Sequence, residues 1–137
     1  MTIISRADSP STFPPAIPVI KTAYEVPHLT DALRGQHAVV CAVGPAGIAS
    51  QAKMMEAAAA AGVRRFVVDD FGYPPAFQRL PELEATGESR RVVLERAAAV
   101  ADRYPGFSWS AVAIAVPVDW VRVALLRDAL SVPVWRD

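Results

Sequence analysis

Residues 37–72 read HAVVCAVGPAGIASQAKMMEAAAAAGVRRFVVDDFG, and this stretch decides the fold class. The apolar run at residues 38–43 has the length and composition of a strand in the interior of a parallel sheet. A glycine-containing loop and an amphipathic helix over residues 48–61 follow, and a second apolar run occupies residues 65–68. The stretch therefore predicts one βαβ unit, whose ligand-binding loops lie at the carboxyl ends of its strands.

The flanking segments continue the alternation of strands and helices. Glycines at positions 35 and 62 supply helix stops, and a proline-rich loop separates the first two strands. Strands that alternate with helices predict an α/β fold with a doubly wound parallel sheet, in one domain over residues 1–137. Outside the βαβ unit we expect strands at residues 2–5, 18–21 and 108–115, and helices at residues 27–34, from Glu84 or Thr86 to Arg103, and at residues 118–130.

Composition excludes several classes of function. Acidic and basic residues balance at 14 each, which argues against binding to nucleic acid or to an anionic membrane surface. The single cysteine, Cys41, lies in an apolar strand and is expected in the core, which favours a cytoplasmic protein without disulfides. Residues 111–126 are too short and too polar to span a bilayer, and the amino-terminal residues do not form a signal peptide. His28 and His37 have no cluster of other ligands around them, so no metal site is expected.

A combined pattern of residues resembles the NmrA-like, or isoflavone-reductase-like, branch of the atypical short-chain dehydrogenases. Each piece alone is a weak signal, but the pieces share one register over roughly residues 2–120. The matching residues are Ile4-Ser5-Arg6, Ala42-Val43-Gly44, Gln51, Lys53, Ala57-Ala58, Ala61-Gly62-Val63, Arg65-Phe66, Phe71-Gly72 and Gly106-Phe107-Ser108-Trp109.

The resemblance implies a Rossmann-type fold that binds NADP(H) and reduces small phenolic or carbonyl substrates. Arg6 stands where the family's arginine meets the 2′-phosphate of NADP, although a solvated loop arginine is the simpler interpretation. Val43 and Gly44 match a cofactor loop, and an ordinary strand-to-helix turn is the alternative. Asp70 and Phe71 match residues beside the nicotinamide.

Two adjacent carboxylates follow the strand at residues 65–68. Asp69 replaces a hydroxyl residue of the family pattern, while Asp70 keeps its carboxylate. The pair could bind a cation or act as acid and base, but a structural role in capping the turn is favoured.

Two departures from the family pattern stand out. The sequence contains no GxxGxxG turn, and it starts at what would be the second strand of the family's 3-2-1-4-5-6 order. The central strand is then missing, which predicts one of three outcomes: the half-sheets close up, the first two strands are poorly held, or another chain fills the space. The family's lysine near the start of the long helix is also absent, and Arg90 there is a poor acid–base group. No catalytic residue is assigned.

The expected function is therefore that of an NmrA-like NAD(P)-binding protein, an oxidoreductase by ancestry. Weak NADP(H) binding and little or no reductase activity follow from the two departures. One alternative is a non-catalytic regulatory or interaction module that recruits a protein partner, or a second copy, through the open gap in the sheet. Another is a truncated fragment of a longer reductase.

Overall fold

A computed structural model of the protein describes residues 1–43, 45–70 and 84–112. The predicted alternation of strands and helices is confirmed over these residues. In chain order the elements are β1 (Ile3–Arg6), β2 (Val19–Thr22), α1 (Val26–Leu33), β3 (Ala38–Val40), the 3-10 helix η1 (Pro45–Ser50), α2 (Gln51–Ala60), β4 (Arg65–Val68), α3 (Glu84–Arg103) and β5 (Ser108–Ala111). The helix expected at residues 118–130 lies outside the described residues.

Boundaries differ from the predictions mainly around the βαβ loop. Residues 48–50 belong to η1, so the regular α-helix starts at Gln51 and not at Ile48. β3 ends at Val40, although the Cys41 N–H still donates to the Val67 carbonyl at 2.9 Å. Gly35 and Gly62, the two predicted helix stops, have φ of 76° and 83°, a conformation that side chains with a Cβ adopt at a cost.

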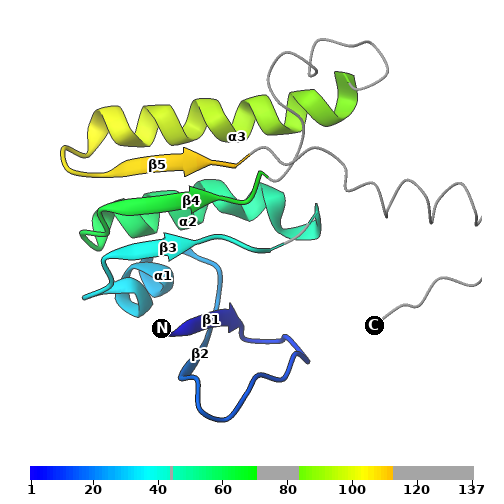
Figure 1. The fold of residues 1–137 in the computed structure, drawn as a ribbon, viewed down its shortest axis with the longest axis vertical. Coiled ribbons are helices and arrows are strands. Elements are labelled where there is room, and N and C mark those ends of the chain that lie inside the picture. Colours follow the sequence, from blue (N-terminus) through cyan, green and yellow to red (C-terminus); the bar gives the residue numbers. More distant parts are fainter. Residues whose placement is uncertain (44, 71–83, 113–137) are drawn as a thin grey trace, which may run out of the picture.

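The strands form two separate parallel sheets, β1–β2 and β3–β4–β5. Figure 1 shows the order of the strands, with β1 and β2 on the open side of β3. Within residues 1–43, 45–70 and 84–112 no hydrogen-bonded pairing joins the two half-sheets, so the described strands do not close up into one sheet. The pairing of β1 with β2, and of β3 with β4 and β4 with β5, agrees with the strand order that the family resemblance implies.

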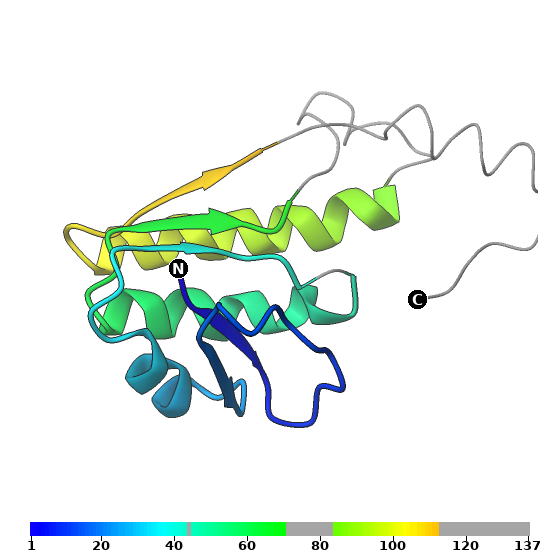
Figure 2. The same ribbon diagram turned by 60° about the horizontal axis from the view of Figure 1, so that its bottom comes forward.

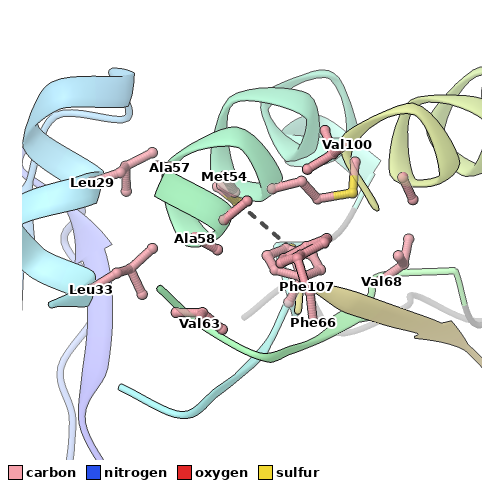
Figure 3. Packing of buried hydrophobic residues seen from close by; sticks show 14 of the residues in the cluster. Leu29, Leu33, Met54, Ala57, Ala58, Val63, Phe66, Val68, Val100 and Phe107 are labelled. Carbon is pink, nitrogen blue, oxygen red and sulfur yellow. Dashed lines mark hydrogen bonds between the residues drawn. The ribbon is translucent and has the colours of Figure 1, made fainter. Parts of the chain in front are cut away.

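The core lies between the three-stranded sheet and one layer of helices. Figure 2 shows α1, α2 and α3 on the same side of this sheet. α2 packs between α1 and α3 and is the central helix of the layer. Phe66 and Met55 are fully buried there, and Leu29 and Leu33 extend from α1 toward Ala57 and Ala58 of α2 (Figure 3).

Two predicted apolar positions are corrected. Val40 was expected in a strand buried on both faces, but its side chain is 69% exposed. Its strand is an edge strand among the described residues, and the described helices cover only one face of the sheet. The apolar residues of the long helix, Val92, Val93, Leu94, Ala97 and Val100, predict one buried side. Val92 is nevertheless 53% exposed, because Val93, Ala97 and Val100 form the face that packs on the core.

Candidate functional site

The candidate site lies at the carboxyl ends of the parallel strands. Arg6 is the last residue of β1, Val43 follows β3 by three residues, and Asp70 follows β4 by two. Parallel strands end at one edge of a sheet, and ligands of open α/β sheets bind in the crevice outside that edge. The predicted site residues Gly44 and Phe71 lie outside the described residues.

Asp69 connects the ends of β3 and β4 through its side chain. Its Oδ2 accepts a hydrogen bond from the Val43 N–H at 2.7 Å. A carboxylate that accepts from a backbone N–H forms a charge-assisted bond, stronger than one between neutral groups. Asp69 thereby fixes the loop that begins after β3, which supports a structural role for this carboxylate.

Gln51 anchors the amino end of α2 to the same loop. Its amide is fully buried and forms two hydrogen bonds with the backbone of Asp69. The Asp69 N–H donates to Oε1 at 2.9 Å, and Nε2 donates to the Asp69 carbonyl at 3.1 Å. A side-chain amide can satisfy one donor and one acceptor of the same residue. Because β4 ends at Val68, the Gln51 amide thereby takes the place of strand-to-strand hydrogen bonds at Asp69.

Asp70 is held by an arginine of α3. Its side chain is 6% exposed, and its Oδ1 lies 3.1 Å from Nε of Arg90, whose side chain is 21% exposed. Burying two charges costs solvation, which their mutual attraction offsets only when the pair stays together. In these two contacts, Asp69 accepts from Val43 and Asp70 pairs with Arg90, so the two neighbouring carboxylates lie against different groups.

Arg6 presents its guanidinium to solvent. Its side chain is 60% exposed, and its nearest acidic partner is Asp8, 79% exposed, with Nε and Oδ1 3.7 Å apart. Exposed pairs of this kind contribute little free energy, so Arg6 can exchange Asp8 for another anion at small cost. The turn after β1 is closed by a hydrogen bond from the Ser9 N–H to the Arg6 carbonyl at 3.1 Å.

The loop after β3 requires glycine at position 47. A Cβ built there would lie 2.6 Å from Cβ of Val43 and 2.8 Å from its Cγ2, closer than side chains approach. η1 therefore turns back directly over the end of β3. The sequence pattern here is compatible with a cofactor loop or with an ordinary turn.

Cys41 is a core residue, as predicted. Its side chain is 3% exposed, and Sγ lies 3.7 Å from Sδ of Met54, the contact drawn dashed in Figure 3. Burial, together with the nearby charge of Asp69, raises the pKa of the thiol to about 12. A thiol that stays protonated at neutral pH is a poor nucleophile.

We expect Cys41 of the folded protein to react with a disulfide reagent at pH 8 at least about a hundredfold more slowly than in the urea-unfolded chain. The sequence contains a single cysteine, so each reagent thiolate that is released reports one reaction at Cys41. Equal rates in the folded and unfolded chains would contradict the burial of Cys41.

An apolar groove also lies between η1, α2 and α3. It has a volume of about 800 Å³, and Ile48, Ala52, Val92 and Val93 are among its lining residues. None of the predicted site residues lines it. The described residues also contain no group of three His, Cys, Asp or Glu side chains that could hold a metal ion, and no helix there has the length and apolarity to cross a membrane.

Gln51 is a structural residue that sequence reasoning missed. Gln51 matches the family pattern, but no role was assigned to it. The feature that could have indicated a role is the position of a polar residue beside a strongly apolar helix face. The structure brings Val43, Asp69 and Gln51 together, joins Asp70 to Arg90, and places Arg6 on the separate β1–β2 sheet.

Comparison with known proteins places this geometry in context. The solved structure of AtPrR2 with NADP+ and (+)pinoresinol superposes with a TM-score of 0.56 at 21% identity, over 69% of this chain and 32% of that one. This likeness shows that the chain has an α/β fold of the Rossmann type. No protein-family model matches the chain.

The sequence is similar to fungal proteins named oxidoreductases. Oxidoreductase poxI of Penicillium oxalicum is 49% identical over 120 residues, which are 88% of this chain and 38% of that protein. Oxidoreductase aprR of Aspergillus flavus is 32% identical over 117 residues, 81% of this chain and 38% of its own length. The chain therefore spans less than two fifths of these relatives.

Proposed function

We propose that the protein is an NmrA-like, isoflavone-reductase-like NAD(P)-binding protein that binds NADP(H) weakly and has little or no reductase activity. The observation that carries the proposal is the position of Arg6, Val43 and Asp70 at the carboxyl ends of parallel strands in a reductase fold. The similarity to proteins named oxidoreductases supports the same class.

The residues present suit only part of the dinucleotide. The exposed Arg6 guanidinium offers bidentate donors for a 2′-phosphate, which favours NADP over NAD. The sequence contains no GxxGxxG turn for the pyrophosphate, and the Val43 N–H is already engaged by Asp69. This partial fit supports weak binding, and we derive no reaction step through the cofactor.

The proposed lack of reductase activity also rests on Arg90. Arg90, near the start of α3, is ion-paired with Asp70, and guanidinium stays protonated at neutral pH. By ancestry, the proposed substrate class is small phenolic or carbonyl compounds. The free buried thiol of Cys41 supports the proposed cytoplasmic location.

Calorimetric titration of the folded protein with NADPH and NADH tests the proposal. We expect weak binding of NADPH and weaker binding of NADH. Replacing Arg6 with Ala should lower the affinity for NADPH about tenfold and leave NADH unchanged, because only NADPH carries the 2′-phosphate.

Arg34 provides the matched control. It is also exposed and paired with an aspartate, Asp31, at 3.2 Å, but it lies at the end of α1. Arg34→Ala should bind NADPH like the unmodified protein. Absence of NADPH binding by the folded protein would overturn the proposal, and rapid NADPH oxidation with a phenolic or carbonyl substrate would overturn the predicted lack of activity.

A further inference from the structure

We propose that Asp69 lowers the affinity of the site for the dinucleotide, because its carboxylate acts as an internal anion where an oxygen of the ligand would bind. This role rests on the proposed function, since it concerns the same cofactor site. Asp69 then does more than hold the loop after β3. Its negative charge is a determinant of the affinity, and a neutral residue at this position should strengthen the binding of both NADPH and NADH.

The Val43 N–H is a hydrogen-bond donor beyond the carboxyl end of β3. Val43 lies three residues after β3 ends, at the edge where ligands of open α/β sheets bind. Oδ2 of Asp69 accepts a hydrogen bond from this N–H at 2.7 Å. A ligand oxygen that binds the same N–H must displace the carboxylate or share the donor with it. Because charge-assisted hydrogen bonds are stronger than neutral ones, either event lowers the affinity for the ligand.

Gln51 fixes the backbone from which this carboxylate projects. The fully buried Gln51 amide accepts from the Asp69 N–H at 2.9 Å and donates to the Asp69 carbonyl at 3.1 Å. A shift of the Asp69 backbone would leave buried polar atoms of Gln51 without these partners, which is costly. Since the side chain of aspartate is short, its charge stays close to the end of β3 even when the carboxylate rotates away from Val43.

The charge of Asp69 acts on its surroundings as well as on the Val43 N–H. Burial is the first cause of the raised pKa of the Cys41 thiol, and the negative charge of Asp69 is the second. Cys41 precedes Val43 by two residues, so this charge is felt along the segment that follows β3. The pyrophosphate of a dinucleotide is also negative, and like charges repel each other most strongly where water is partly excluded.

The substitution Asp69→Asn separates the charge from the hydrogen bond. The amide oxygen of asparagine can still accept from the Val43 N–H, so the contact is retained. One negative charge is removed, whatever other groups the side chain contacts. We expect the dissociation constants of NADPH and NADH each to fall about tenfold. The ratio of the two constants should stay within about twofold, because both cofactors carry the pyrophosphate and only the 2′-phosphate distinguishes them.

Asp31→Asn is the matched control. Asp31 lies on α1, is 72% exposed and forms an ion pair with Arg34 at 3.2 Å. The control makes the same chemical change and alters the net charge by the same amount, but at a position away from the carboxyl ends of the strands. It should bind both cofactors within about twofold of the unmodified protein. An equal gain in affinity from Asp31→Asn would show an effect of net charge alone and would overturn the proposal.

Titrations that follow the fluorescence of the reduced nicotinamide at low ionic strength measure these affinities and separate the possible outcomes. If the unmodified protein binds NADPH and Asp69→Asn binds it no more tightly, the role of Asp69 is overturned and the proposed function stands. If neither protein binds NADPH, both are overturned. Binding by Asp69→Asn alone would support the role of Asp69, and it would contradict the proposed weak binding by the unmodified protein.

Amide NMR spectra without cofactor test the contact itself and the fold of the variant. The Val43 amide proton should move upfield in Asp69→Asn, because its acceptor loses the negative charge. The Phe66 amide, in the middle of β4, should keep its chemical shift. If Asp69→Asn does not fold, Asp69→Ser makes the same test, since serine is also small and neutral. An unchanged shift of the Val43 amide in a folded variant would overturn the proposal.

Discussion

Replacing Phe66 with Ala should lower the free energy of unfolding by about 4 kcal/mol. Phe66 is fully buried in β4, with an exposed fraction of 0%. The centroid of its ring lies 6.3 Å from that of Phe107. Truncation removes the burial of the ring and leaves a cavity between the sheet and the helices. Since domains of this size have a free energy of unfolding of only about 5–15 kcal/mol, the variant should lose a large part of its stability.

Urea denaturation followed by circular dichroism measures this effect. Phe66→Leu keeps most of the apolar volume and should cost about 1 kcal/mol. Val92→Ala, at an exposed position of α3, should change stability by less than about 0.5 kcal/mol. A loss below about 1 kcal/mol for Phe66→Ala would contradict a packed core on this side of the sheet.

Replacing Gln51 with Leu should destabilise the protein by about 3 kcal/mol, although the two side chains have similar volumes. The substitution removes both hydrogen bonds to the Asp69 backbone and leaves a donor and an acceptor without their partner. Each buried polar group that loses its partner costs about 1–3 kcal/mol. An apolar side chain of similar size cannot recover this loss, because Gln51 is already fully buried.

Gln36→Leu serves as the control for the chemical change itself. Gln36 is exposed in the turn after α1, so the same substitution there should alter stability by less than about 0.5 kcal/mol. Gln51→Leu should also speed hydrogen exchange of the Val43 and Asp69 amides, because both belong to the connection between β3 and β4. Unchanged stability of Gln51→Leu would show that this connection does not contribute to folding.

The periodicity of apolar residues was sufficient to predict most of the fold. β4 begins and ends at the predicted residues, α3 begins at one of its two predicted starts, and the positions of Gly35 and Gly62 follow from helix stops. These features depend on local spacing and on backbone conformations that few residue types adopt. A single sequence carries that information directly.

Features that depend on tertiary neighbours could not be predicted in the same way. The run at residues 38–43 is apolar enough for an interior strand, but the exposure of Val40 depends on whether another strand lies beside it. The partners of the adjacent carboxylates were equally hidden, because Val43 is 26 residues from Asp69 in sequence. Of the predicted site residues, Arg6, Val43 and Asp70 can be placed, and their roles toward a cofactor remain proposals.

The helical connection between the two sheets has a consequence for how the protein opens. In the described residues no backbone ladder joins β1–β2 to β3–β4–β5, and the contacts run through α1 on α2. The exposed pair of Lys53 and Glu25 adds little to that contact. The two-stranded sheet should therefore open as a separate cooperative unit, at lower free energy than the larger sheet. Unfolding then takes place in two steps, first of the β1–β2 sheet and then of the β3–β4–β5 sheet. A single melting temperature would describe only the second step.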